Sequence, residues 1–134
     1  MREAKLMQEI VIDDVDRIGI LADVSRLLGD MGINLSAVSV RVEGEAVQIR
    51  LVTSSQSYAR EALQDAGYAV REHDVIVMEL PHHPGFLCRI AEALARRDLT
   101  ITDLRATVPD DGDTGLVVFA CANNLLAIQL LRGR

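Results

Sequence analysis

The second half of the chain repeats the hydrophobic pattern of the first half at an offset of 66 residues. The match needs no gap, and apolar positions meet apolar positions although few residues are identical. Ile10, Val24, Leu28, Ile33, Leu35 and Val38 align with Ile76, Ile90, Leu94, Leu99, Ile101 and Leu104. A repeat of this kind indicates two copies of one supersecondary unit. We therefore expect one module over residues 1–72 and a second over residues 73–134.

The first copy begins as a strand, a helix and a strand. Residues 6–12 are rich in β-branched side chains, which favours a strand. Apolar side chains then recur with helical period from Ile20 to Met31, and Gly32 follows at a position that suits a helix end. Over residues 38–42, valines alternate with polar side chains, which is typical of an antiparallel strand with one wet face.

The rest of the first copy completes a βαββαβ order. A turn at 43–45 leads to a third alternating strand over 47–51, then to a helix over about 57–66 and a strand over 68–72. The predicted fold class is therefore α+β, with two ferredoxin-like βαββαβ modules. Each would have a four-stranded antiparallel sheet with both helices on one face.

The second copy differs from the first at its end. Residues 116–121 are apolar without alternation, so both faces of that strand should be covered. Asn123 and Asn124 are good capping residues for a last helix that is apolar nearly all round. The sequence ends where the fourth strand would begin, so we expect this copy to lack its last strand. We also expect the sister copy or another chain to cover the free edge.

Composition excludes several classes of partner. The 134 residues are 49% hydrophobic but only 3% aromatic, and a net charge of −6 with a pI near 5.0 leaves no basic stripe for nucleic acid. No apolar run is long enough for a bilayer, and the N-terminus does not resemble a signal peptide. We expect a cytoplasmic protein in which Cys88 and Cys121 are buried, reduced thiols.

Two loop motifs resemble the signature of ACT domains, small modules that bind amino acids and regulate metabolic enzymes. The first copy has residues 16–22, Asp-Arg-Ile-Gly-Ile-Leu-Ala, and then residues 31–35, Met-Gly-Ile-Asn-Leu. The second copy has residues 83–87, His-Pro-Gly-Phe-Leu, and then residues 98–101, Asp-Leu-Thr-Ile. The whole chain resembles small stand-alone tandem ACT proteins, which carry no catalytic domain.

The motifs depart from the usual acid–basic–Pro–Gly loop of the family. The first copy has Ile18 in the Pro position but keeps the acid, the glycine and the later asparagine. The second copy has His82 in place of the acid and Thr100 in place of the asparagine. The first copy therefore holds the fuller set of polar groups.

The resemblance implies a free amino acid as effector, held between modules against this loop of one and the second strand of its neighbour. A helix N-terminus suits the carboxylate, and a glycine lets the ligand approach the backbone. An acid and an amide oxygen suit the ammonium. The candidate ligand-binding residues are Asp16, Arg17, Ile18, Gly19, Ile20, Leu21, Asn34, His82, His83, Gly85, Phe86, Leu87 and Thr100.

Each candidate also has a structural interpretation. Asp16 could be only the N-cap of the first helix, and Arg17 could be solvated. The two loop glycines could serve only helix–sheet packing, and the four apolar candidates that follow them could belong to the core. Asn34 could satisfy backbone groups of its own loop. The acidic run 110–113 is interpreted as a solvated hairpin turn.

The preferred function is a non-enzymatic regulatory module that binds an amino acid, forms a homodimer or a higher homo-oligomer, and signals to a separate metabolic enzyme. The alternative is a structural interaction module whose ligand sites have degenerated. A small enzyme or a metal protein using His82 and His83 is a third reading. It is disfavoured because zinc needs three or four ligands and because phosphate, dinucleotide and nucleophile motifs are missing. No metal, cofactor or catalytic residue is expected.

Overall fold

The computed structural model describes residues 3–81, 84–107 and 114–132, which divide into two compact units. The N-terminal unit comprises Gln8–His73. The C-terminal unit runs from Asp74 onwards and also includes the segment that ends at Met7. The elements in chain order are β1 (Lys5–Val15), α1 (Ile20–Asp30), β2 (Leu35–Glu43), β3 (Ala46–Thr53), α2 (Gln56–Asp65), β4 (Val70–Leu80), α3 (Phe86–Ala95), β5 (Ile101–Thr107), β6 (Gly115–Cys121) and α4 (Asn124–Leu131).

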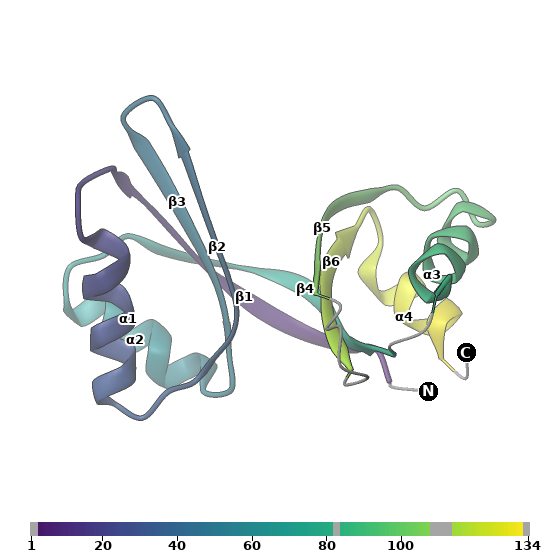
Figure 1. Ribbon diagram of the computed structural model, residues 1–134, viewed down its shortest axis with the longest axis horizontal. Coiled ribbons are helices and arrows are strands. Elements are labelled where there is room, and N and C mark those ends of the chain that lie inside the picture. Colours follow the sequence, from purple (N-terminus) through teal and green to yellow (C-terminus); the bar gives the residue numbers. More distant parts are fainter. Residues whose placement is uncertain (1–2, 82–83, 108–113, 133–134) are drawn as a thin grey trace. The chain divides into compact units, whose positions relative to one another are not determined.

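The N-terminal unit is the predicted ferredoxin-like module. Its strand order is β2-β3-β1-β4, and β3 pairs antiparallel with both β1 and β2. Helices α1 and α2 lie together on one side of these strands (Figure 1). The core between helices and sheet is aliphatic, with Ile10, Ile12, Val24, Leu28, Ile49, Leu51 and Leu63 among its buried residues. The antiparallel α+β fold class is confirmed.

The C-terminal unit has the same strand order, but its outer strand comes from the other end of the chain. The order is β1-β4-β6-β5, in which the β1 residues before Gln8 take the place of a fourth strand. Ala4 is 4% exposed and packs in the core of this unit with Ile76, Met78 and Leu80. Among the described residues α4 is the last element of this unit, and β1 fills the outer position of its sheet, where the first unit has a strand that follows its second helix.

Strand β4 replaces two strands that the sequence analysis treated separately. Residues 68–72 were expected to close the first copy and residues around 76–78 to open the second, but Val70–Leu80 is one strand of 11 residues. No Gly, Pro or Asn interrupts this segment, so nothing turns the chain there. Both units therefore take strand residues from β4, as they do from β1.

The end of the C-terminal unit agrees with the sequence analysis. Val117, Phe119 and Cys121 of β6 are buried in the core against α3 and α4, and Val118 is also buried although it points to the opposite face. Asn123 caps α4, its side-chain oxygen accepting the Leu126 N–H at 3.1 Å. Among the described residues, no helix has the length and apolar character that crossing a membrane requires.

Helices α1 and α3 end with the same backbone geometry, but the left-handed position is a glycine in α1 and an aspartate in α3. Ile33 N–H donates to Leu28 O at 3.0 Å around Gly32, whose φ is +74°. Leu99 N–H donates to Leu94 O at 3.1 Å around Asp98, whose φ is +57°. Both are left-handed helix ends, but only glycine adopts that conformation without strain.

Replacing Asp98 by glycine should therefore stabilise the protein. We expect Asp98→Gly to raise the free energy of unfolding by about 0.5–1 kcal/mol, because it removes the strain of an L-residue in the left-handed region. Gly32→Asp is the matched control at the equivalent position and should lower it by a similar amount. Urea unfolding at unchanged m-value measures both. A lower unfolding midpoint for Asp98→Gly would contradict this interpretation.

Candidate functional site

The strand-to-helix bend of the N-terminal unit is open and carries free polar groups. Gly19 is the N-cap of α1 with φ +88°, and a Cβ built there meets no atom within 4 Å. Among the described residues, no backbone acceptor is recorded for the N–H groups of Leu21 and Ala22. Asp16 is exposed and its N–H donates to Glu45 O at 2.7 Å, which ties the bend to the β2–β3 turn. The bend thus offers N–H donors beside a carboxylate.

The bend of the C-terminal unit repeats this backbone. Gly85 is the N-cap of α3 with φ +87°, and its Cβ direction is equally open. Arg89 N–H donates to Gly85 O at 3.0 Å, as Asp23 N–H donates to Gly19 O at 2.9 Å. His82 and His83, predicted for this site, lie outside the described residues. The two bends are therefore alike in backbone, whereas a described acidic side chain accompanies only the first.

Several structural interpretations of these residues are now decided. Asp16 is not the N-cap, because Gly19 holds that position and no side chain caps α1. The glycines are not required for close packing, since open space surrounds both Cβ directions; they are required for positive φ. Ile20 and Phe86 are core residues, whereas Leu21 and Leu87 are exposed beside the bends, as is Ile18.

Arg17 is partly exposed but engaged. Its Nη1 donates to Asp23 Oδ2 at 2.9 Å and its Nη2 to the Tyr68 hydroxyl at 3.4 Å. The hydrogen bond to Asp23 raises the pKa of Arg17 above its usual value. The guanidinium therefore links the loop to the first turn of α1 through this hydrogen bond. A ligand carboxylate would have to compete with Asp23 for it.

Asn34 does not lie beside the bend of its own unit. It precedes β2, at the C-terminal end of α1, while Asp16 and Gly19 precede the N-terminal end. Eleven helical residues separate the two ends by about 16 Å. Asn34 is exposed, and no hydrogen bond of its side chain to another described residue is recorded. Thr100 holds the equivalent exposed place before β5. One unit alone therefore cannot bring these predicted groups to a single amino acid.

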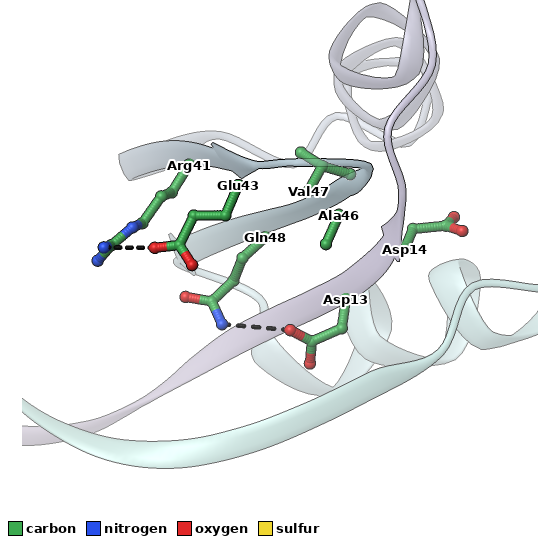
Figure 2. A pocket seen from close by; sticks show the side chains of 7 residues that line it. All are labelled: Asp13, Asp14, Arg41, Glu43, Ala46, Val47 and Gln48. Carbon is green, nitrogen blue, oxygen red and sulfur yellow. Dashed lines mark hydrogen bonds and ion pairs between the residues drawn. The ribbon is translucent and has the colours of Figure 1, made fainter.

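A surface pocket of about 270 Å³ was missed by the sequence analysis. It lies at the end of the β2–β3 hairpin and is lined by Asp13, Asp14, Arg41, Glu43, Ala46, Val47 and Gln48 (Figure 2). Gln48 Nε2 donates to Asp13 Oδ1 at 3.2 Å, and Arg41 forms an ion pair with Glu43. The cross-strand register that aligns Arg41, Gln48 and Asp13 could be found only once the strand pairing was known.

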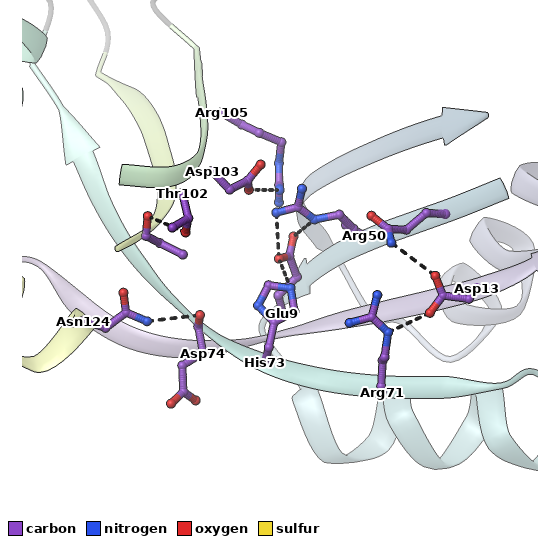
Figure 3. Close-up of polar contacts among 12 residues, drawn as sticks. Glu9, Asp13, Arg50, Arg71, His73, Asp74, Thr102, Asp103, Arg105 and Asn124 are labelled. Atoms are coloured by element: carbon purple, nitrogen blue, oxygen red, sulfur yellow. Dashed lines mark hydrogen bonds and ion pairs between the residues drawn. The ribbon is translucent and has the colours of Figure 1, made fainter. Parts of the chain in front are cut away.

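A polar cluster around one buried carboxylate, on the sheet of the N-terminal unit, was also missed. Glu9 is fully buried, and Arg50 donates two hydrogen bonds to its carboxylate, from Nε to Oε1 at 3.2 Å and from Nη2 to Oε2 at 3.1 Å. His73 Nε2 lies 3.2 Å from Glu9 Oε2 (Figure 3). Glu9 lies on β1, Arg50 on β3 and His73 on β4, so the cluster links neighbouring strands. The burial of Glu9 favours a role of the cluster in stability.

The remaining candidates for reactive chemistry are few. Cys88 is exposed, which contradicts the expectation of a buried thiol, because it lies on the outer face of α3; Cys121 is buried as expected. The hydrogen bond from Cys88 to Glu92 raises the pKa of the thiol, which disfavours the thiolate. Among the described residues, no group of three His, Cys, Asp or Glu side chains could hold a metal ion.

Comparisons with known proteins agree with the resemblance seen in the motifs. The model of a family described as ACT domain matches residues 10–60. Protein BT0572 from Bacteroides thetaiotaomicron has a similar structure, with a TM-score of 0.88 and 25% identity, over 96% of this chain and 88% of that chain. No curated protein sequence matches significantly.

Two aspartate kinase regulatory subunits share the fold at lower identity. The subunit from Thermus thermophilus has a TM-score of 0.64 at 17% identity, over 95% of this chain and 93% of that chain. The subunit from Thermus flavus has a TM-score of 0.56 at 16% identity, over 96% of this chain and 94% of that chain. These matches extend over both units and show that the fold occurs in regulatory subunits.

Proposed function

We propose that this chain, whose residues 10–60 match the model of the ACT domain family, is a non-enzymatic regulatory protein that binds a free amino acid. The observation that carries the proposal is the open bend at Gly19, where first-turn N–H groups stand beside the exposed Asp16. The ligand would be sensed between two ACT modules, and the signal would pass to a separate enzyme of amino-acid metabolism in the cytoplasm.

The chemistry of the bend suits both charges of a zwitterion. The N–H groups of Leu21 and Ala22, together with the helix dipole, favour the ligand carboxylate. The Asp16 carboxylate favours the ammonium through a charge-assisted hydrogen bond. The exposed side chain of Leu21 lies in the first turn of α1, where it can contact an apolar part of the ligand. A small amino acid thus meets complementary groups at each end.

The ligand site needs a second module, because Asn34 lies at the far end of α1 from the bend. A neighbouring module can supply its own Asn34, or Thr100, to the bend of the first. This requirement supports a homodimer or a higher homo-oligomer as the binding form. Ligand that binds only the assembled form will stabilise that form, which is the physical basis for regulation.

A screen of the twenty protein amino acids at millimolar concentration tests the proposal. We expect at least one of them to raise the melting temperature, by about 2–8 °C for each kcal/mol of linked stabilisation. Asp16→Ala combined with Asn34→Ala should abolish the shift. Asp65→Ala combined with Gln64→Ala removes an acid and an amide from the exposed end of α2 and should preserve it. No shift with any amino acid, confirmed by calorimetry, would refute the proposal.

The alternative is an interaction module whose ligand sites have degenerated. It is favoured by Ile18 in the Pro position and by Thr100, which offers a hydroxyl instead of an amide. In that case the doubly substituted Asp16→Ala, Asn34→Ala protein would keep its partner, and no amino acid would change its stability.

A further inference from the structure

We propose that Arg17 switches between two positions: it binds Asp23 and Tyr68 without ligand, and it binds the ligand carboxylate when an amino acid occupies the Gly19 bend. The proposal rests on the proposed function, since it describes how that same site is regulated. It concerns the Arg17 cluster, which comprises Arg17, Asp23, Arg26 and Tyr68 of the N-terminal unit. Arg17 lies in the loop before α1, Asp23 and Arg26 lie on α1, and Tyr68 lies between α2 and β4.

The contact with Asp23 holds the Arg17 guanidinium beside the place expected for the ligand carboxylate. Helical side chains lean toward the N-terminus of their helix, so the Asp23 carboxylate lies over the first turn of α1. Arg17 Nη1 donates to Asp23 Oδ2 there, at 2.9 Å. The N–H groups of Leu21 and Ala22, which the proposed function assigns to the ligand carboxylate, belong to the same turn. A bound amino acid therefore offers Arg17 a second carboxylate close to the first.

Arg17 can leave Asp23 at a small cost in free energy. The two side chains are 48% and 44% exposed, and exposed ion pairs contribute little to stability. Asp23 also has a second cation, because Arg26 Nη1 lies 3.4 Å from Asp23 Oδ1, the oxygen that Arg17 does not bind. The Asp23 carboxylate thus keeps a counter-charge when Arg17 moves to the ligand.

Tyr68 connects the switch to the start of β4. It packs against the core of the N-terminal unit, and its N–H donates to Leu63 O at 3.0 Å, so its backbone is fixed at the end of α2. Its hydroxyl accepts a hydrogen bond from Arg17 Nη2 at 3.4 Å. When Arg17 moves to the ligand, this hydroxyl loses that donor. Occupancy of the bend is in this way communicated to the segment between α2 and β4.

The C-terminal unit shows that the fold of the bend does not depend on this ion pair. At the offset of 66 residues, Arg89 takes the place of Asp23 and Glu92 takes the place of Arg26, so both charges are reversed. The backbone at Gly85 nevertheless has the same conformation as at Gly19, with φ of +87° and +88°. Because the bend forms with either arrangement of charge, a role of the Arg17 cluster in the ligand response is favoured over a structural one.

A double-mutant cycle on affinity tests the switch, with calorimetry of whichever of the twenty amino acids gives the largest thermal shift. Asp23→Asn should strengthen binding by about two- to five-fold, because it weakens the competitor for Arg17. Arg17→Ala should weaken binding by about ten-fold, because the ligand carboxylate loses a charge-assisted hydrogen bond. In the Arg17→Ala background, Asp23→Asn should have no effect, since Asp23 acts through Arg17.

Asp13→Asn is the matched control for the cycle. Asp13 is an acid of similar exposure, 49%, that also pairs with an arginine of the N-terminal unit, Arg71. Its substitution should leave the affinity unchanged. Unchanged affinity for Arg17→Ala, no gain for Asp23→Asn, or a gain that persists without Arg17 would overturn the switch while the proposed function stands. Failure of every amino acid to bind both the wild type and Asp23→Asn would overturn the two proposals together.

Tyrosine signals provide a readout that a purely structural ion pair would not move. The chain has two tyrosines, and Tyr58 is 68% exposed on α2. In protein labelled with ¹³C-tyrosine, the same amino acid should shift the ring signals of Tyr68 in nuclear magnetic resonance spectra and leave those of Tyr58 in place. Arg17→Ala should abolish the shift at saturating ligand. Tyr68 signals that stay unchanged when the wild type binds ligand would also overturn the switch.

Discussion

A Glu9→Ala protein is expected to lose about 3–5 kcal/mol of folding free energy, the largest single-residue effect we predict. Glu9 is fully buried, and the Arg50 side chain that binds it through two hydrogen bonds is only 16% exposed. Removing the carboxylate leaves that guanidinium without its main counter-charge in a place that water hardly reaches. Chemical denaturation followed by circular dichroism measures the loss.

Asp13→Ala is the matched control on the same strand. Asp13 also binds an arginine, with Arg71 Nε 2.7 Å from Oδ2, but both side chains are about half exposed. An exposed pair of this kind contributes about 0–1 kcal/mol. If Asp13→Ala destabilises the protein as much as Glu9→Ala, burial is not the cause of the large loss expected for Glu9→Ala. Glu9→Gln, which keeps the shape of the side chain, provides the measurement if Glu9→Ala does not fold.

The Asp13 control also predicts a pH dependence. The hydrogen bonds from Arg71 and Gln48 lower the pKa of Asp13 below its ordinary value. A carboxyl group with a lower pKa in the folded state stabilises the protein above its unfolded-state pKa, and this contribution disappears as the pH falls through the folded-state value. The stability difference between wild type and Asp13→Ala should therefore be constant near neutral pH and vanish under strongly acidic conditions.

The second large effect concerns ligand binding. Asp16→Ala should weaken binding of the amino acid by roughly ten- to hundred-fold, because a charge-assisted hydrogen bond to the ammonium is lost. Folding should be almost unaffected, since Asp16 is exposed and does not cap α1. Isothermal calorimetry gives the affinity, and thermal unfolding without ligand gives the stability. A lowered stability with normal affinity would assign Asp16 a purely structural role.

The repeat predicted most of the fold because apolar periodicity fixes which face of each element is buried. The alternation at 47–51 became β3 with its apolar face buried, and the capping residue Asn123 began α4 as expected. The alternation at 38–42 also became a strand, β2, but its valines are 41–51% exposed, because β2 is the outer strand of the unit. The sequence placed a glycine at each strand-to-helix bend, and the structure shows that both glycines have positive φ.

The sequence could not show which segments distant along the chain lie together. The use of residues before Gln8 as the outer strand of the C-terminal unit depends on strand pairing, which local periodicity does not encode. Glu9 and Arg50 look like solvent-exposed residues until the fold buries Glu9 and leaves the Arg50 side chain only 16% exposed. The separation of Asn34 from Asp16 likewise depends on the direction of α1. Because the two residues lie at opposite ends of that helix, a site that uses both must be built from two modules.

The most direct test of the account mixes two inactive variants. If each site takes Asp16 from one copy and Asn34 from the other, Asp16→Ala and Asn34→Ala chains, unfolded and refolded together, should regain wild-type affinity at about one quarter of their sites. Each variant refolded alone should bind at least ten-fold more weakly than wild type. Calorimetry of the mixture that shows no tight-binding sites would contradict a ligand site shared between two copies.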